Sequence, residues 1–377
     1  MSLEHFRRHI PELVLAFFAL IFALVFFAPL SEGVEAFLTA ALDVALFVIL
    51  AMFAYLAEDR HPAFRWAAIV WLFALIGGIA AATAGIGVVA LLPAGALGTE
   101  SLSHVMTSEI ALLFLGISMA ALVSLLGFSR RFRIWLARYL PFDPDSFVHR
   151  IALVTILALI LIPPVPLLVV GIPPYLSPQF IELLTGSGDF FADMIQVNVY
   201  GLFWILVASL LIAGACVRRT LAGALKRLGL TMPTGREVVL AVAAALALVA
   251  LFYFIDPVLV ALVSYLGLPV TDTDLVNLLF AGTLTPLGIV ATSVAAGFGE
   301  EVSIRGLLQP RFGILLPALL FASLHAFQYS WDGLISVFLA GIIFAYIRKR
   351  INTTASAITH TVYDLVLFAL LFAGMSI

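Results

Sequence analysis

Residues 295–327 read AAGFGEEVSIRGLLQPRFGILLPALLFASLHAF, an apolar segment that carries two adjacent glutamates, Glu300 and Glu301, near its start. Two histidines follow: His325 at the end of this segment and His360 in a later apolar run. An ionisable group at membrane depth costs about 2.5–3.5 kcal/mol on insertion scales, so each one needs a partner or a function. These four groups predict a polar centre inside a hydrophobic protein, with the rest of the chain as its scaffold.

The composition of the whole chain predicts an all-α, polytopic membrane protein. Of its 377 residues, 63% are hydrophobic and 11% are charged, and the mean hydropathy is +1.18. A backbone in lipid must satisfy its own hydrogen bonds, so long apolar runs form helices or closed barrels. These runs lack the alternation of barrel strands, which favours helices. The lipid bilayer is therefore the first partner we expect, and the net charge of −3 gives no indication of nucleic acid.

Apolar runs recur along the entire sequence and predict about eleven spans. The two runs between 312 and 347 are short, and we expect them to be helices buried inside the bundle. The runs lie near 11–30, 34–57, 66–94, 106–128, 150–172, 196–217, 237–265, 284–309, 312–327, 333–347 and 355–374.

The charges of the loops alternate along the chain and predict its orientation. Loops rich in arginine, such as 130–150 and 218–236, alternate with loops that carry mainly acidic residues. The positive-inside rule then places the N-terminus in the cytosol and the C-terminus outside. Arginine greatly outnumbers lysine and alanine is abundant, a composition that favours a prokaryotic cytoplasmic membrane.

Paired prolines interrupt the fifth span, within IPPVPLLVVGIPP (162–174). Proline lacks the backbone N–H that an α-helix needs, so the helix should break here and leave carbonyl oxygens free. A kinked packing helix is one interpretation. The other is a transporter, because broken helices mark the binding sites of many transporters.

The spacing of the charged residues predicts which of them share a helix face. Glu301 and Arg305 are four residues apart and can pair, as can His360 and Asp364. Glu300 points about 100° away from Glu301 on the same helix, so at least one of these carboxylates faces inward.

Counting along each helix predicts that Glu300, His325 and His360 lie at similar depths, given about 1.5 Å of rise per residue. They could therefore meet in one cavity, closer to the cytoplasmic end. A carboxylate in an apolar cavity is suited to act as a general base. A histidine opposite it can hold the attacking water or donate to an oxyanion. Together these groups suit hydrolysis of a peptide bond by activated water.

Three motifs in this region are similar to those of a known family. They are E-E-x-x-x-R at Glu300, Glu301 and Arg305, F-x-x-x-H at Phe321 and His325, and H-x-x-x-(N/D) at His360 and Asp364. In this order they resemble the CPBP family of intramembrane proteases. That family includes CaaX prenyl endopeptidases and bacteriocin-processing or immunity proteins, and it is also called the Abi family. The resemblance covers roughly residues 280–372.

The resemblance implies a role for each motif residue. Glu300 would activate the water, which His325 would help to hold. His360 and Asp364 would form the oxyanion site, where the eukaryotic CaaX enzymes carry Asn in the last position. An Asp side chain can donate a hydrogen bond to an oxyanion only when it is protonated. The remaining motif residues would support the geometry (Glu301 and Arg305) or pack the cavity where substrate binds (Phe321).

No metal or other cofactor is expected. Two histidines and two glutamates could in principle ligate zinc, but the H-E-x-x-H motif of zinc proteases is absent from the sequence. The family resemblance implies glutamate chemistry that is independent of metal.

We expect two regions, an N-terminal transmembrane region of about six spans (1–235) and a CPBP-like protease domain (236–377). The substrate would be a membrane-associated or C-terminal peptide segment, with or without a lipid modification. Two alternatives stay open. One is a non-proteolytic immunity or scaffold protein, which the intact motif residues disfavour. The other is a proton- or ion-coupled transporter, for which the sequence lacks evident inverted repeats.

Overall fold

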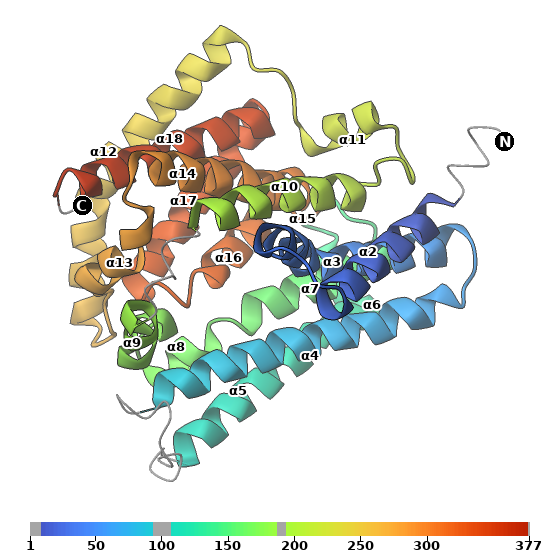
Figure 1. Cartoon of the computed structure of the whole chain (residues 1–377), viewed down its shortest axis with the longest axis horizontal. Helices are drawn as coiled ribbons and strands as arrows, with labels where there is room; N and C mark the ends of the chain where they lie inside the picture. The colour runs from blue at the N-terminus through green and yellow to red at the C-terminus, as the bar shows by residue number, and fades with distance from the viewer. Residues whose placement is uncertain (1–8, 93–106, 187–193, 376–377) are drawn as a thin grey trace.

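The computed structural model describes residues 9–92, 107–186 and 194–375, and all regular elements within these ranges are helices (Figure 1). The predicted all-α class is therefore confirmed. The π-helix η5 and the 3₁₀-helices η2, η3 and η4 interrupt or connect the α-helices. In chain order the elements are α2 (Ile10–Phe27), α3 (Glu32–Asp59), α4 (Phe64–Leu91), α5 (Thr107–Ser124), η2 (Leu125–Phe128), α6 (Arg130–Leu136), α7 (Phe147–Leu161), α8 (Val165–Val170), η3 (Pro174–Leu176), α9 (Pro178–Gly186), α10 (Met194–Ile212), α11 (Leu221–Leu228), α12 (Gly235–Tyr265), α13 (Thr273–Leu279), η4 (Ala281–Thr283), α14 (Pro286–Glu300), η5 (Glu301–Gly306), α15 (Gln309–Phe312), α16 (Leu315–Leu324), α17 (Trp331–Arg350) and α18 (Thr353–Phe372).

Ten helical segments in the described ranges are long and apolar enough to cross a membrane. The chain is thus an integral, multi-pass membrane protein. The count differs from the eleven apolar runs because the run at 312–327 forms only the ten-residue helix α16, which is about 15 Å long. The run at 333–347 was expected to be short, but it extends at both ends into the 20-residue helix α17.

Hydrogen bonds group the loops at two opposite ends of the bundle. At one end, the Tyr175 N–H donates to the carbonyl of Phe327 at 2.9 Å, and Ser330 Oγ donates to the carbonyl of Pro269 at 2.7 Å. At the other end, the Thr353 N–H donates to the carbonyl of Gly229 at 3.0 Å. The loop after α16 therefore reaches the same end as the loops around α9 and α13, although α16 itself is short (Figure 1). This grouping agrees with the alternation of charge, while the side that faces the cytosol stays a prediction.

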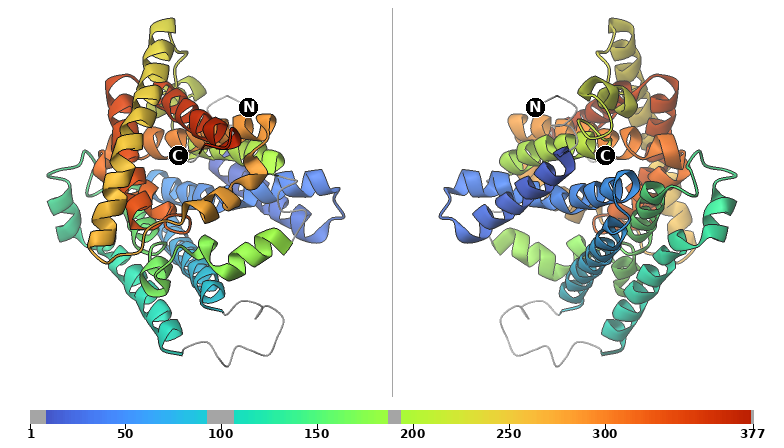
Figure 2. Two further views of the ribbon diagram at one scale, coloured as in Figure 1. Left: turned by 90° about the vertical axis from the view of Figure 1, so that its left-hand side faces the viewer. Right: turned by 90° about the vertical axis from the view of Figure 1, so that its right-hand side faces the viewer.

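Two N-terminal helices hold the C-terminal helices in place. Helix α10 packs against both α3 and α14, and α7 packs against both α5 and α16. The two side views show the yellow-to-red helices α12–α18 grouped on one part of the molecule and the blue and cyan helices α2–α5 on another (Figure 2). Helices α7 and α10 thus contact both groups of helices, and the division into two regions stays a prediction.

The predicted break in the fifth span is confirmed, because α7 ends at Leu161 just before the prolines at 163–164. Those prolines cannot donate to the carbonyls of Leu159 and Ile160, four residues earlier. Instead, Ser323 Oγ of α16 lies 3.0 Å from the Leu159 oxygen and 2.7 Å from the Ile160 oxygen. A hydroxyl from a neighbouring helix therefore satisfies the freed backbone, as a packing helix requires.

Candidate active site

The two glutamates stand where an α-helix changes into a π-helix. Helix α14 begins with Pro286 at its first position, and the Thr285 hydroxyl accepts the Gly288 N–H at 3.0 Å, a favourable N-cap. Glu300 is the last residue of α14, and Glu301 opens the π-helix η5. Short π-helical turns are rare and occur frequently at functional sites. The local backbone therefore singles out the same residues as the sequence motif.

Glu301 is fully buried, and both of its carboxylate oxygens contact polar side chains. Its Oε1 lies 3.0 Å from Nη1 of Arg305, and both side chains are 0% exposed. Ser356 Oγ of α18 donates to Glu301 Oε2 at 2.6 Å, and His360 Nδ1 lies 3.2 Å from Oε1. A carboxylate with three partners and no contact with solvent is suited to hold neighbouring groups in position.

Arg305 is held by aromatic rings as well as by the carboxylate. Its guanidinium carbon lies 4.0 Å from the centre of the Phe321 ring and 5.7 Å from that of Phe344, within the range of cation–π attraction. Within the described residues, none of the three guanidinium nitrogens of Arg305 has a hydrogen-bond partner, so its contact with Glu301 is an ion pair. Gly341 makes room for this arrangement, since a Cβ there would lie 3.0 Å from Phe321 and 3.2 Å from Arg305 Nη2.

His360 of α18 lies among three carboxylates. Its Nδ1 faces Glu301, while its Nε2 lies 3.5 Å from Asp364 Oδ2 and 3.9 Å from Glu300 Oε2. The imidazole stacks on Phe344 with the ring centres 4.4 Å apart and an interplanar angle of 19°. Because a carboxylate only accepts hydrogen bonds, the contact with Glu301 favours a proton on Nδ1. The ring is therefore fixed with Nε2 directed at the other two acids.

Exposure distinguishes the three carboxylates. The Glu300 side chain is 33% exposed, compared with 17% for Asp364 and 0% for Glu301. Two polar atoms 3.9 Å apart, as Glu300 Oε2 and His360 Nε2 are, can both lie about 2.8 Å from a third atom. A water molecule could therefore contact both residues, and Glu300 is the acid that it would reach most easily.

His325 lies at the end of α16, on the other side of Phe321. Its Nδ1 lies 2.8 Å from the Phe321 carbonyl, which can only accept, so Nδ1 carries the proton and the neutral ring presents a free electron pair on Nε2. The Phe321 ring contacts His325 with the centres 4.8 Å apart and His360 with the centres 5.9 Å apart. In the part of the chain that the structure describes, this ring connects the two histidines, which form no hydrogen bond with each other.

Phe321 itself is 3% exposed and belongs to a buried hydrophobic cluster. Its faces and edges are occupied by Arg305, His325 and His360. Little of the ring is therefore free to touch a substrate, whereas its contacts fit a packing role.

The structure brings Glu300, Glu301, Arg305, His360 and Asp364 into one cluster, with His325 joined to it through Phe321. Sequence reasoning missed three partners. Ser356 lies four residues before His360, and its hydroxyl bonds Glu301. Tyr329 lies four residues after His325 and stacks on it. In both cases the spacing of four residues was the available signal. The third partner, Phe344, had no such signal, because it comes from a different helix.

Among the residues that the structure describes, no three His, Cys, Asp or Glu side chains are arranged to hold one metal ion. The expectation of metal-independent chemistry stays a prediction.

The fold and the cluster define a class of protein: an all-helical integral membrane protein with a buried carboxylate, guanidinium and imidazole centre. Residues 282–366 match the family described as Type II CAAX prenyl endopeptidase Rce1-like. This part of the chain is thus a domain of that protease family, which confirms the resemblance found in the sequence motifs. The match includes all seven motif residues from Glu300 to Asp364. No curated protein and no solved structure matches the chain.

Proposed function

We propose that the protein is an intramembrane endopeptidase in which Glu300 activates a water molecule. The observation that carries this proposal is the combination of the accessible Glu300 carboxylate with His360 Nε2, 3.9 Å away, inside a domain of a protease family. Glu301 is excluded from the role of base because Arg305, Ser356 and His360 already occupy its buried carboxylate.

The proposed reaction is supported by the proximity of Glu300 to His360 Nε2 and, for His325, by the motif resemblance. Glu300 takes a proton from the water, and the water oxygen attacks the carbonyl carbon of the peptide bond. His325, with its free Nε2 electron pair, accepts a hydrogen bond from the same water and helps to orient it. Glu300 then passes the proton to the amide nitrogen that leaves.

We assign to His360 the role of stabilising the oxyanion. The tetrahedral intermediate carries a negative charge on the former carbonyl oxygen, and a preorganised donor stabilises it. His360 Nε2 can donate when the ring carries both protons, and the carboxylates of Glu301, Asp364 and Glu300 surround that ring. Asp364 then acts on the oxyanion through His360, or directly when protonated.

The proposed substrate is a membrane-associated or C-terminal peptide segment, with or without a lipid modification, because the cluster lies between helices that cross the membrane. We assign the chemistry to residues 236–377 and a supporting role to residues 1–235. The proposed setting is a prokaryotic cytoplasmic membrane with the N-terminus in the cytosol, since the charge pattern of the loops favours that orientation.

The test is a comparison of peptide termini in membranes from cells that carry the wild-type protein or the Glu300→Ala variant. New termini that occur only with the wild type support a protease and identify its class of substrate. The matched control is Glu35→Ala, which removes an exposed carboxylate at the start of α3 and should leave the pattern of termini unchanged. Identical termini in all three samples would contradict the proposal and favour an immunity or scaffold role.

A further inference from the structure

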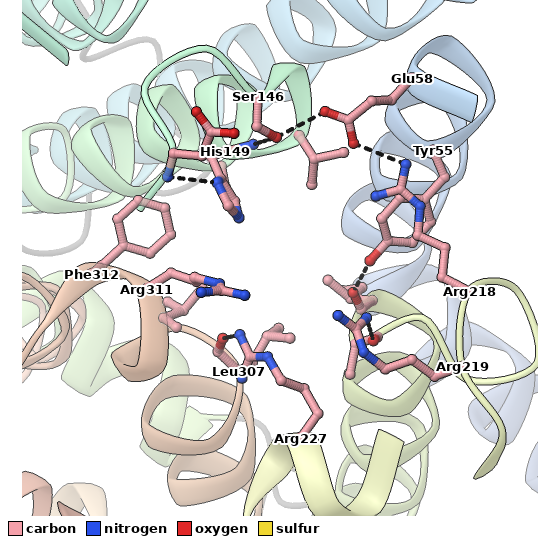
Figure 3. A pocket seen from close by; sticks show the side chains of 16 residues that line it. Tyr55, Glu58, Ser146, His149, Arg218, Arg219, Arg227, Leu307, Arg311 and Phe312 are labelled. Carbon is pink, nitrogen blue, oxygen red and sulfur yellow. Dashed lines mark hydrogen bonds and ion pairs between the residues drawn. The ribbon is translucent and has the colours of Figure 1, made fainter. Parts of the chain in front are cut away.

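A second polar site lies away from the cluster around His360. It is a cavity of about 460 Å³ where the ends of α3, α7, α10, α11 and α15 meet (Figure 3). None of its lining residues belongs to the candidate active site. Because arginines dominate its polar lining, we call it the arginine cavity. It lies at the end of the bundle that the charge pattern places at the cytosolic face.

Four arginines line the arginine cavity: Arg218 and Arg219 after α10, Arg227 in α11 and Arg311 in α15 (Figure 3). Arg219 donates to the carbonyl of Ala213 at 2.5 Å, and Arg227 donates to the carbonyls of Gly306 and Leu307 at 3.2 and 3.3 Å. These carbonyl acceptors are neutral, so the hydrogen bonds do not neutralise the positive charges of the two guanidinium groups.

Two acids, Glu58 and Asp143, also line the cavity, and neither forms an ion pair with Arg219, Arg227 or Arg311 in the described part of the chain. Glu58 pairs with Arg218 at 2.9 Å and accepts the Ser146 hydroxyl at 2.8 Å, and Asp143 accepts the backbone N–H of Asp145 at 2.9 Å. The arginine–carboxylate pairs formed by the described residues use Arg60, Arg130, Arg218 and Arg305. Arg219, Arg227 and Arg311 are therefore without an acidic partner in that part of the chain.

Burial and the neighbouring positive charges both disfavour the charged form of Arg227. Burial, followed by the positive charges of Arg311, Arg219 and Arg348, lowers the pKa of Arg227 to about 10. Cations brought together in a partly buried space repel one another more strongly than in water. An anion bound between these cations would reduce that repulsion. The charges in the cavity therefore favour binding of a negatively charged ligand.

His149 of α7 adds a directional donor. Its Nδ1 accepts the backbone N–H of Asp143 at 3.1 Å, so the neutral ring carries its proton on Nε2. Figure 3 shows this ring directed into the cavity above Arg311. Guanidinium groups match the oxygens of phosphate with paired hydrogen bonds, and an imidazole N–H supplies one more.

We propose that the arginine cavity binds a phosphate-type anion, held by its three unpaired arginines and by the Nε2 hydrogen of His149. The anion comes either from the head group of an anionic lipid or from soluble phosphate or pyrophosphate. The two sources share the same chemistry, and the experiment separates them.

The experiment uses the purified full-length protein in a neutral detergent. Binding of inorganic phosphate and of pyrophosphate is measured by calorimetry at constant ionic strength, with chloride as the reference anion. Binding of phosphatidic acid is measured against phosphatidylcholine by native mass spectrometry. Saturable binding of the soluble anions assigns the site to free phosphate, and selective retention of phosphatidic acid assigns it to a lipid head group.

Two variants decide whether the binding belongs to this cavity. Arg311→Gln and Arg219→Gln should each raise the apparent Kd by about tenfold or more, since each removes a charge-assisted contact with the anion. Arg130→Gln is the matched control, because Arg130 pairs with Asp145 and does not line the cavity; its Kd should stay within about twofold. The proposal is overturned if neither anion source binds, or if both cavity variants bind as tightly as the control.

Discussion

The carboxylate of Glu301 lies 3.0 Å from the guanidinium of Arg305, one turn further along the same helix, and solvent reaches neither side chain. Removing one member of a buried ion pair leaves the other charge uncompensated, at a cost of about 3–5 kcal/mol. We therefore expect Glu301→Ala to lower the Tm of the purified protein strongly. Thermal unfolding in detergent, followed by circular dichroism, measures the effect.

The double variant Glu301→Leu/Arg305→Met separates charge compensation from catalysis. Because both charges are removed together, the double variant should be more stable than Glu301→Ala. Its peptidase activity should stay low, since His360 loses the carboxylate that fixes its Nδ1. A double variant less stable than the single one would contradict the supporting role of the pair.

Unlike Glu301→Ala, the Glu300→Ala variant should keep its stability and lose its cleavage activity. The Glu300 side chain is partly exposed, and its nearest ion-pair partner, His360 Nε2, is 3.9 Å away, beyond direct hydrogen-bond distance. We expect a Tm close to that of the wild type and a loss of cleavage rate of about 10²–10⁴-fold, the usual contribution of a general base. Cleavage kinetics on a substrate identified from the peptide termini test this. Retained activity in the purified variant would refute the assignment.

Asp364→Asn should keep substantial activity. The side chain flanks His360 Nε2 at 3.5 Å, and an amide can donate a hydrogen bond to an oxyanion without being protonated. The rate is compared with that of Asp364→Ala, which removes both the charge and the donor and should lose more. An inactive Asn variant with an unchanged Tm would argue against a role for this position in the oxyanion site.

Gly297→Ala should disturb the cluster through packing alone. A Cβ at this position would lie 2.1 Å from Thr361 Oγ1 and 2.6 Å from the Thr361 backbone nitrogen, so α14 and α18 must move apart. We expect a loss of stability of about 1–3 kcal/mol, as for other overpacked sites, together with a fall in activity. Gly299→Ala is the control on the same helix, because its nearest neighbour atoms lie 3.7–3.8 Å away. Equal effects of the two variants on Tm would contradict this explanation.

Ser323→Ala should destabilise the protein without touching the cluster. The variant leaves the carbonyls of Leu159 and Ile160 without their hydroxyl partner, at a cost of about 1–3 kcal/mol. The control is Ser124→Ala, whose hydroxyl bonds the carbonyl of Ala121 in its own helix at 2.6 Å. Unfolding temperatures of the two variants in detergent should differ clearly, and similar values would show that the Ser323 hydroxyl is dispensable.

The helical class and the identity of the polar residues were predictable from the sequence, because both depend on local information. Continuous apolar runs predict helices in lipid, and a spacing of four residues places Glu301 with Arg305 and His360 with Asp364. The proline break after Leu161 was predictable for the same reason.

What the sequence did not reveal depends on contacts between distant segments. The stacking of Phe344 on His360 and the hydrogen bond from Ser323 to α7 join helices whose relative register no local pattern encodes. The run at 312–327 was counted among the eleven apolar runs although it was expected to be short, and only ten of its residues form helix α16. Hydropathy measures composition, while helix length also depends on where the backbone turns. The arginine cavity was read only as loop charge, since its residues come from separate segments.

The bond between Ser323 and the broken end of α7 also determines how far the protease region can be separated from the rest of the chain. The family match begins at residue 282, yet α16 supplies the hydroxyl for α7, and Asn198 of α10 donates to Thr292 of α14 at 2.8 Å. In hydrocarbon, water cannot replace such partners. Helices α7 and α10 thus supply hydrogen-bond partners that the protease region uses in the folded protein. If the connection before α12 were cut, the two fragments would have to reassociate to regain the native protein.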